Sequence, residues 1–299
     1  MADVSSLSSS RRAFLGLGGA LGLGVAGAVT ATAVGRSADP VVSSPGSALG
    51  CAGGKDSGEL AAFRTQTAEG TVEQRIAATR LTASSAPEPT GASRIFGCHY
   101  VSRADWGADE SLRFLPDGSE NWPQTYWPTQ TFTVHHTADA NADPDPQIRI
   151  QNIYRYHAID QDWGDIGYHF LIDDAGLIYE GRYSGEDSVP GFDTDGQMVN
   201  AAHVTGYNAG NVGIALLGDF TAVEPSAKQY RSLVRLLRGL TRWQGVDPQS
   251  TVDYVNPISA VAASVAAISS HRDWPGTATE CPGDTFHPML EQLRVDVAG

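Results

Sequence analysis

The amino-acid composition changes near Arg94, and this change limits how much of the chain can build a packed core. Residues 34–93 are rich in Ala, Ser, Thr, Gly and Glu and contain hardly any aromatic residues. Such a segment cannot bury enough apolar surface to offset the entropy that it would lose on ordering. From Arg94 onward, tryptophans, tyrosines and periodically spaced aliphatic residues continue to the C-terminus. We therefore expect a disordered linker over residues 34–93 and one domain of ordinary size over residues 94–299.

The N-terminal residues have the pattern of an export signal. Residues 10–15 read SRRAFL, a twin-arginine pattern, and a weakly apolar, glycine-rich run follows over residues 15–30. Ala31 and Ala33 then place small residues where a signal peptidase reads them. A membrane anchor is the alternative, but the run is short and its glycines disfavour a spanning helix. We expect a cleaved twin-arginine signal peptide over residues 1–33, a secreted mature protein, and no stable membrane insertion after cleavage.

Net charge and cysteine content restrict the possible partners. The formal net charge of -14 argues against nucleic acid and against an anionic membrane surface, because both would repel the chain. Three cysteines are too few for a disulfide scaffold. If Cys281 is committed to another role, Cys51 and Cys98 can form a disulfide; alternatively, Cys51 stays free. A lipid anchor on Cys51 is a third alternative, but this residue lies well beyond the apolar run.

Several segments have the periodicity of β-strands. Residues 131–137 alternate like a half-buried strand, and residues 212–217 form a continuous apolar run that is typical of a central strand. Residues 168–172 and 177–180 flank the turn sequence DDAG, which predicts a β-hairpin.

Other segments have helical periodicity. Residues 144–159 carry apolar side chains at helical spacing, with Asp143 as the expected N-cap. A long amphipathic helix is predicted after Ser226, and a closing helix over residues 285–295. Strands and helices together predict an α/β fold, close to α+β, with a mixed central β-sheet flanked by helices.

Two histidines and a cysteine are candidate metal ligands. A catalytic zinc site needs three protein ligands from His, Cys or carboxylate, and a fourth position that stays open. His135 lies on a predicted strand, and its neighbour His136 must point to the opposite face. His271 opens the turn-rich segment 271–284, which also contains Cys281. The spacing of His271 and Cys281 is by itself a weak signal for a metal site.

Seven segments in order resemble the peptidoglycan recognition protein and type-2 N-acetylmuramoyl-L-alanine amidase family, which includes phage T7 lysozyme. They are VSRADWG at 101–107, VHHT at 134–137, DIGYHF at 165–170, IYEGR at 178–182, AHVTGYN at 202–208, GIALLGD at 213–219, and HRD at 271–273 with TECPGD at 279–284. No single segment is decisive, but seven in register are highly specific. The resemblance implies the fold of this family for the domain.

The resemblance also implies the roles of individual residues. It implies that His135, His271 and Cys281 are Zn²⁺ ligands and that Tyr168 supports catalysis. Thr279, two residues before the cysteine, is the second expected catalytic residue, and its expected role is to orient the oxyanion or the water. The stretch between His271 and Thr279 is longer than is usual in relatives, so a small insertion is expected in this loop. The ligand identities do not depend on the insertion.

The activity implied by the resemblance is hydrolysis of the amide between N-acetylmuramic acid and L-alanine in peptidoglycan, with a muropeptide as substrate. We expect the protein to be a monomer. Two alternatives are a non-catalytic peptidoglycan-binding protein and a zinc hydrolase acting on another amide. Inactive members of the family typically replace the cysteine, so the presence of Cys281 favours catalysis.

Four further residues are open to more than one interpretation. Glu180 is an outside candidate for a general base. Arg182 is interpreted as a solvated charge at the end of a strand, with contact to a stem-peptide carboxylate as the alternative. His203 either lines the cleft or is structural, whereas His157 is expected in the core.

Overall fold

The computed structural model describes residues 93–186 and 189–299. The expected signal peptide at 1–33 lies outside the described residues, as do Cys51 and all of the expected linker except Ser93. Their predicted roles therefore stay predictions. In the part of the chain that is described, no helix combines the length and apolar character needed to cross a membrane.

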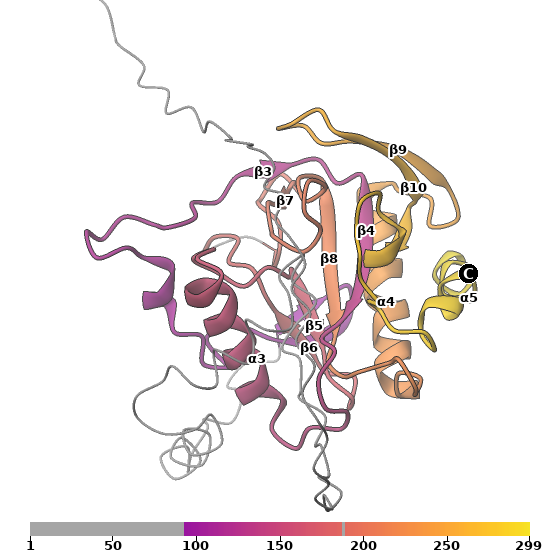
Figure 1. Cartoon of the computed structure of the whole chain (residues 1–299), viewed down its shortest axis with the longest axis horizontal. Helices are drawn as coiled ribbons and strands as arrows, with labels where there is room; N and C mark the ends of the chain where they lie inside the picture. Colours follow the sequence, from indigo (N-terminus) through magenta and orange to yellow (C-terminus); the bar gives the residue numbers. More distant parts are fainter. Residues whose placement is uncertain (1–92, 187–188) are drawn as a thin grey trace, which may run out of the picture. The chain divides into compact units, whose positions relative to one another are not determined.

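Seven of the described strands form one mixed β-sheet with the order β1-β2-β6-β5-β8-β4-β11 (Figure 1). The strands are β1 (Ser93–Ile95), β2 (Cys98–Val101), β6 (Ile178–Glu180), β5 (Phe170–Ile172), β8 (Asn211–Leu216), β4 (Thr131–His136) and β11 (Ile268–Ser270). The two pairs β3 (Tyr126–Trp127) with β7 (Met198–Val199) and β9 (Thr251–Val255) with β10 (Ala262–Ala266) are separate from it. The predicted mixed sheet is confirmed.

The sheet contains both parallel and antiparallel strand pairs. Strands β5, β8, β4 and β11 run parallel to one another, and β2 is parallel to β6. The pairs β5–β6 and β1–β2 are antiparallel. The hairpin predicted around the turn DDAG is therefore confirmed as β5–β6. The apolar run at 212–217 is confirmed as central, because β8 lies between β5 and β4.

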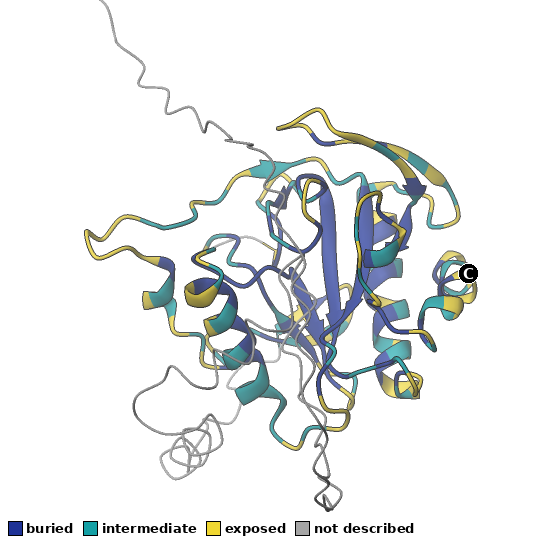
Figure 2. Ribbon diagram, in the orientation of Figure 1, coloured by how far each residue is buried: buried dark blue, intermediate teal, exposed yellow. Residues whose placement is uncertain are grey.

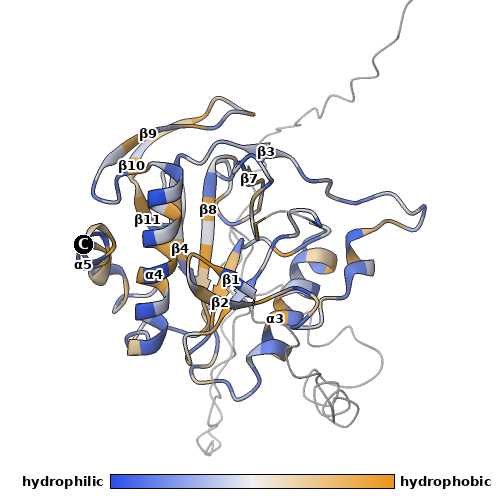
Figure 3. Ribbon diagram, turned by 180° about the vertical axis from the view of Figure 1, so that it is seen from behind, coloured by the Kyte–Doolittle hydropathy of each residue, from blue (hydrophilic) through white to orange (hydrophobic). Residues whose placement is uncertain are grey.

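Helices cover both faces of the sheet (Figure 1). Helices α4 (Ala227–Gln244) and α5 (Leu290–Ala298) pack on one face, and α3 (Pro146–Arg155) packs on the other. A π-helical turn over Tyr156–Asp160 continues α3, and short 3₁₀ turns occupy Glu110–Arg113, His271–Asp273 and His287–Met289. Hydrophilic and hydrophobic residues alternate along α4, as an amphipathic surface helix requires (Figure 3).

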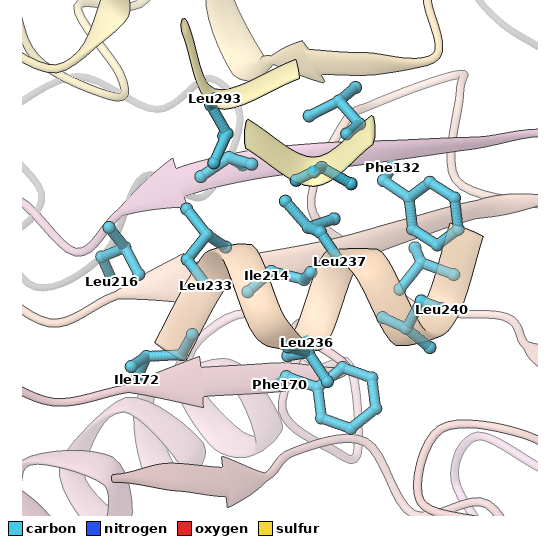
Figure 4. Close-up of a cluster of buried hydrophobic side chains, with 14 of the residues drawn as sticks. Phe132, Phe170, Ile172, Ile214, Leu216, Leu233, Leu236, Leu237, Leu240 and Leu293 are labelled. Carbon is cyan, nitrogen blue, oxygen red and sulfur yellow. The ribbon is translucent and has the colours of Figure 1, made fainter. Parts of the chain in front are cut away.

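The face beneath α4 and α5 is an apolar core. Leucines at helical spacing on α4 meet the apolar side chains of the strands (Figure 4). The main contributors are Phe132, Phe170, Ile172, Ile214, Leu216, Leu233, Leu236, Leu237, Leu240 and Leu293. Helix α4 begins as predicted at the N-cap Ser226, whose side chain accepts a hydrogen bond from the Gln229 backbone amide.

The face beneath α3 combines apolar packing with a buried ionic cluster. Asp165 is fully buried and pairs with Arg103 at 2.9 Å and with Arg182 at 2.7 Å. The Arg182 guanidinium also lies over the Trp122 ring, 4.1 Å from its centroid. The interpretation of Arg182 as a solvated charge is therefore wrong. Its charge is buried because a carboxylate and an aromatic ring compensate for the lost water.

Three local predictions differ from the structure. Strand β4 is buried on both faces rather than one, because it lies between β8 and β11 with other layers above and below (Figure 2). Helix α3 begins after the N-cap Asp145, since the Asp143 carboxylate instead accepts from the Asp145 amide and pairs with Arg149. The closing helix begins later than predicted, at Leu290, after a 3₁₀ turn.

The hairpin β9–β10 was not predicted from the sequence pattern. Strand β10 (AASVA) consists mostly of small residues and gives little signal, and the alternation in β9 (TVDYV) is only five residues long. Tyr254 and Val265 pack with Tyr207 and Trp274 in a small separate cluster. The hairpin thus lies against the loop that follows His271.

Candidate metal centre

The parallel register of β4 and β11 places His271 beside His135. Ser270 pairs with Val134, and each histidine directly follows one member of this pair. The two imidazole centroids are 4.9 Å apart. Both side chains are buried, with 0% exposure for His135 and 2% for His271.

Cys281 completes a group of three potential metal donors. Its Sγ atom lies 3.6 Å from His135 Nδ1, although 146 residues separate the two in sequence. One donor atom each from His135, His271 and Cys281 lies within 4.8 Å of the other two. The structure therefore brings together the three residues proposed as ligands from the sequence.

Hydrogen bonds hold the cysteine loop in place. The Cys281 backbone amide donates to Thr279 Oγ1 at 3.1 Å, and the His136 backbone amide lies 3.4 Å from Cys281 Sγ. A backbone donor of this kind favours the thiolate form that metal binding requires. Trp274 anchors the preceding residues, because its indole N–H donates to the buried Thr133 hydroxyl at 2.9 Å.

The residues present fit a metal ion. His271 Nδ1 is buried and has no hydrogen-bond partner among the described residues, which is costly unless another group satisfies it. Burial lowers the pKa of His271 to about 4 and holds the pKa of His135 well below its ordinary value, with neighbouring imidazoles adding to both shifts. Both rings are therefore neutral near pH 7, as metal ligation requires.

Tyr168 lies beside this group of donors. Its ring centroid is 5.3 Å from that of His135, and its side chain is almost fully buried. The Tyr168 backbone carbonyl passes so close to Gly181 that a Cβ there would lie 2.1 Å from the oxygen. The absence of a side chain at Gly181, directly after β6, thus allows the Tyr168 backbone to pack closely against it. Thr279, in contrast, contacts the centre through the Cys281 backbone.

The other candidate residues have different surroundings. His203 contacts His135 directly, with 3.0 Å between Nδ1 and Nε2. His157 is buried in the core, as expected, and accepts a hydrogen bond from the Gly167 amide. Glu180 accepts from the Arg103 amide beside the buried ionic cluster, and burial raises the pKa of its carboxyl group. The Glu180 side chain thus bonds to a member of that cluster rather than to one of the three donors.

Comparison with known families agrees with this architecture. The family model for N-acetylmuramoyl-L-alanine amidase matches residues 125–284, more than half of the chain. This chain therefore belongs to the N-acetylmuramoyl-L-alanine amidase family.

Individual relatives include both amidases and recognition proteins. The chain is 29% identical over 204 residues to a human N-acetylmuramoyl-L-alanine amidase, covering 65% of this chain and 28% of the human protein. It is 30% identical over 195 residues to peptidoglycan recognition protein 1 of Bos indicus, covering 64% and 82%. The solved structure of Drosophila PGRP-LB is 25% identical, with 65% and 93% coverage and a TM-score of 0.46. The chain thus spans little more than a quarter of the human amidase.

Proposed function

We propose that this protein is a zinc-dependent N-acetylmuramoyl-L-alanine amidase that hydrolyses the bond between N-acetylmuramic acid and L-alanine in peptidoglycan. The observation that carries the proposal is the buried group of two neutral imidazoles and one thiol, from His135, His271 and Cys281. Nitrogen and sulfur donors of this kind suit zinc, and three protein ligands leave a position for solvent or substrate.

Each residue of the centre has a definite task in this mechanism. His135, His271 and Cys281 would hold the ion, and Thr279 keeps the Cys281 backbone in place through its hydroxyl. Zinc, when bound, supplies Lewis acidity towards the scissile carbonyl and a nucleophile near neutral pH. Tyr168, whose ring packs near that of His135, would donate a hydrogen bond from its hydroxyl to the developing oxyanion.

The competing function is recognition of peptidoglycan without cleavage, because relatives of both kinds match this chain. A binding protein does not need a buried thiol next to two neutral imidazoles. The unsatisfied Nδ1 of His271 would be a cost without benefit in such a protein. Both observations favour catalysis.

We further propose that residues 1–33 direct export through the twin-arginine pathway and are then removed. The arginine pair at residues 11–12 and the apolar run after it support this proposal. N-terminal sequencing of the protein recovered outside the cytoplasm tests it. A start near residue 34 is expected, and an intact N-terminus would contradict cleavage.

The amidase proposal is tested by digesting purified peptidoglycan with the full chain and analysing the products. We expect free muramic acid lactyl groups together with released stem peptides, loss of release with a chelator, and recovery with Zn²⁺. Cys281→Ser should lose both the metal and the activity. Cys98→Ser is the matched control, because Cys98 lies on the distant strand β2. Peptidoglycan binding without any release would leave only the recognition function.

A further inference from the structure

His203 forms a hydrogen-bonded chain with His135 inside the protein. His203 Nδ1 lies 3.0 Å from His135 Nε2, and His203 Nε2 lies 2.9 Å from the Asn211 backbone oxygen. The His203 side chain is 2% exposed, so it has almost no surface to offer to a substrate. Any effect of His203 on chemistry must therefore pass through His135.

The direction of each hydrogen bond in this chain follows from its last member. A backbone carbonyl can only accept, so the hydrogen of the His203 ring is on Nε2. In a neutral imidazole the other nitrogen is then an acceptor, and His135 Nε2 must donate to it. This leaves the lone pair of His135 on Nδ1, the atom that lies 3.6 Å from Cys281 Sγ.

Two features hold the His203 ring in this position. The Asn208 side-chain oxygen accepts hydrogen bonds from the His203 and Val204 backbone amides, at 2.9 and 2.8 Å. Gly213 on β8 leaves the space that the ring fills, since a Cβ there would lie 2.5 Å from His203 Cγ. A glycine in a central strand costs stability, and here its small size makes room for the imidazole.

We propose that His203 is a positioning residue that fixes the tautomer and ring orientation of His135, so that Nδ1 of His135 is always the nitrogen presented to the metal. The proposal rests on the metal centre described under the proposed function. Partners of this kind orient metal-bound histidines in general, and their loss typically lowers metal affinity about 10- to 100-fold.

The first part of the test is a direct measurement of the tautomer in metal-free protein. Long-range ¹H–¹⁵N NMR of the histidine rings should show the Nε2–H form for both His135 and His203. In His203→Leu, which has no acceptor, the His135 ring should become a mixture of both neutral tautomers. A mixed or Nδ1–H form of His135 in the parent protein would overturn the proposal.

The second part measures Zn²⁺ affinity by competition with a chromophoric chelator, independently of any activity. His203→Leu should bind zinc about 10- to 100-fold more weakly. His203→Asn should retain most of the affinity, because its amide oxygen can replace Nδ1 as the acceptor. Gly213→Ala keeps histidine at position 203 but pushes its ring aside, and it should also weaken zinc binding. It provides a separate test should His203→Leu fail to fold.

His157→Leu is the matched control. His157 is also a buried imidazole, but its Nδ1 accepts from the Gly167 backbone amide rather than from a candidate metal ligand. We expect this variant to lose stability but to keep the parent zinc affinity. If His203→Leu binds zinc as tightly as the parent, the proposed role of His203 is refuted and the metal centre is not. Failure of the parent itself to bind zinc would instead refute the metal centre.

Discussion

The two faces of the central sheet differ in how their side chains are satisfied. Beneath α4 and α5 the contacts are apolar, and Phe132 and Val134 of β4 point into this layer. On the opposite face of the same strand, Thr133 bonds to Trp274 and Asn211, and His135 bonds to His203. One strand thus contributes alternate residues to a hydrophobic core and to a polar centre. The apolar face stabilises the fold, and the polar face can carry chemistry.

A second contrast lies within the polar residues themselves. The buried cluster of Asp165 with Arg103 and Arg182 has a partner for each charge. Burial alone would raise the pKa of Asp165, but the two guanidinium groups hold it below its ordinary value. His271 Nδ1, in contrast, has no protein partner among the described residues. A satisfied cluster indicates a structural role, whereas an unsatisfied ring nitrogen beside a second imidazole and a thiol indicates a site.

The largest expected effect tests the apolar face. Leu237 on α4 is fully buried, and Leu237→Ala should lower the free energy of unfolding by about 4 kcal/mol, because it removes apolar contacts and leaves a cavity. Guanidinium denaturation measures this change. The folded fraction should still bind zinc with the parent affinity. A parallel loss of zinc affinity would show that the two faces are not independent.

The buried imidazoles of the polar face make stability depend on pH. Burial lowers the pKa of His157 to about 3 and that of His169 to about 4, whereas both titrate near 6.5 in the unfolded chain. The unfolded state therefore binds more protons below pH 6.5. Stability should be fully present above this pH and fall by about 1.4 kcal/mol per pH unit for each ring, or about 3 kcal/mol for His169 by pH 4.

Denaturation series at pH 7, 6 and 5 measure this dependence in the metal-free protein. His169→Gln should show a shallower slope than the parent, by the contribution of one ring. An unchanged slope would mean that His169 is already charged in the folded protein.

Tyr168→Phe tests the polar face without creating a cavity. The variant should keep its zinc and its fold but lose on the order of a hundredfold in kcat, because one oxyanion donor is removed. This corresponds to about 2.7 kcal/mol of barrier. Steady-state kinetics on soluble muropeptide, with metal content measured in parallel, check the result. Full activity in this variant would exclude Tyr168 as the donor.

The smallest effect concerns the start of α4, outside both buried layers. Ser226→Ala removes the hydroxyl that caps the Gln229 amide and should cost about 1 kcal/mol. Thermal unfolding measures the loss. Ser226→Asp, which can also cap, should restore most of the stability. Equal stability of the alanine variant would show that the tertiary contacts of α4 suffice to define its first turn.

The sequence predicts the apolar face well, because periodicity reports directly on it. The run at β8, the hairpin β5–β6 and the capped helix α4 all bury continuous or periodic apolar residues. Such patterns are local, so they can be read without knowledge of the fold. The grouping of His135, His271 and Cys281 was predicted instead from the family resemblance, since these residues are far apart in the chain.

The polar face could not be predicted in the same way. Arg182 is buried because Asp165 pairs with it and the Trp122 ring lies against its guanidinium, and no local pattern encodes these tertiary contacts. The buried Thr133 hydroxyl is satisfied by Trp274, which donates to it from a distant loop. The contact between His203 and His135 likewise depends on the space left by Gly213. Partners of buried polar groups are set by tertiary structure rather than by composition.

The parallel pairing of β11 with β4 also determines when the donors can meet during synthesis. His135 on β4 is synthesised early. Its neighbours His271 and Cys281 follow only in the segment directly after β11. A nascent chain that has not yet added this last strand to the sheet lacks two of the three donors. Under the proposed function, an ion can be held by all three donors only after β11 and the loop as far as Cys281 have been made.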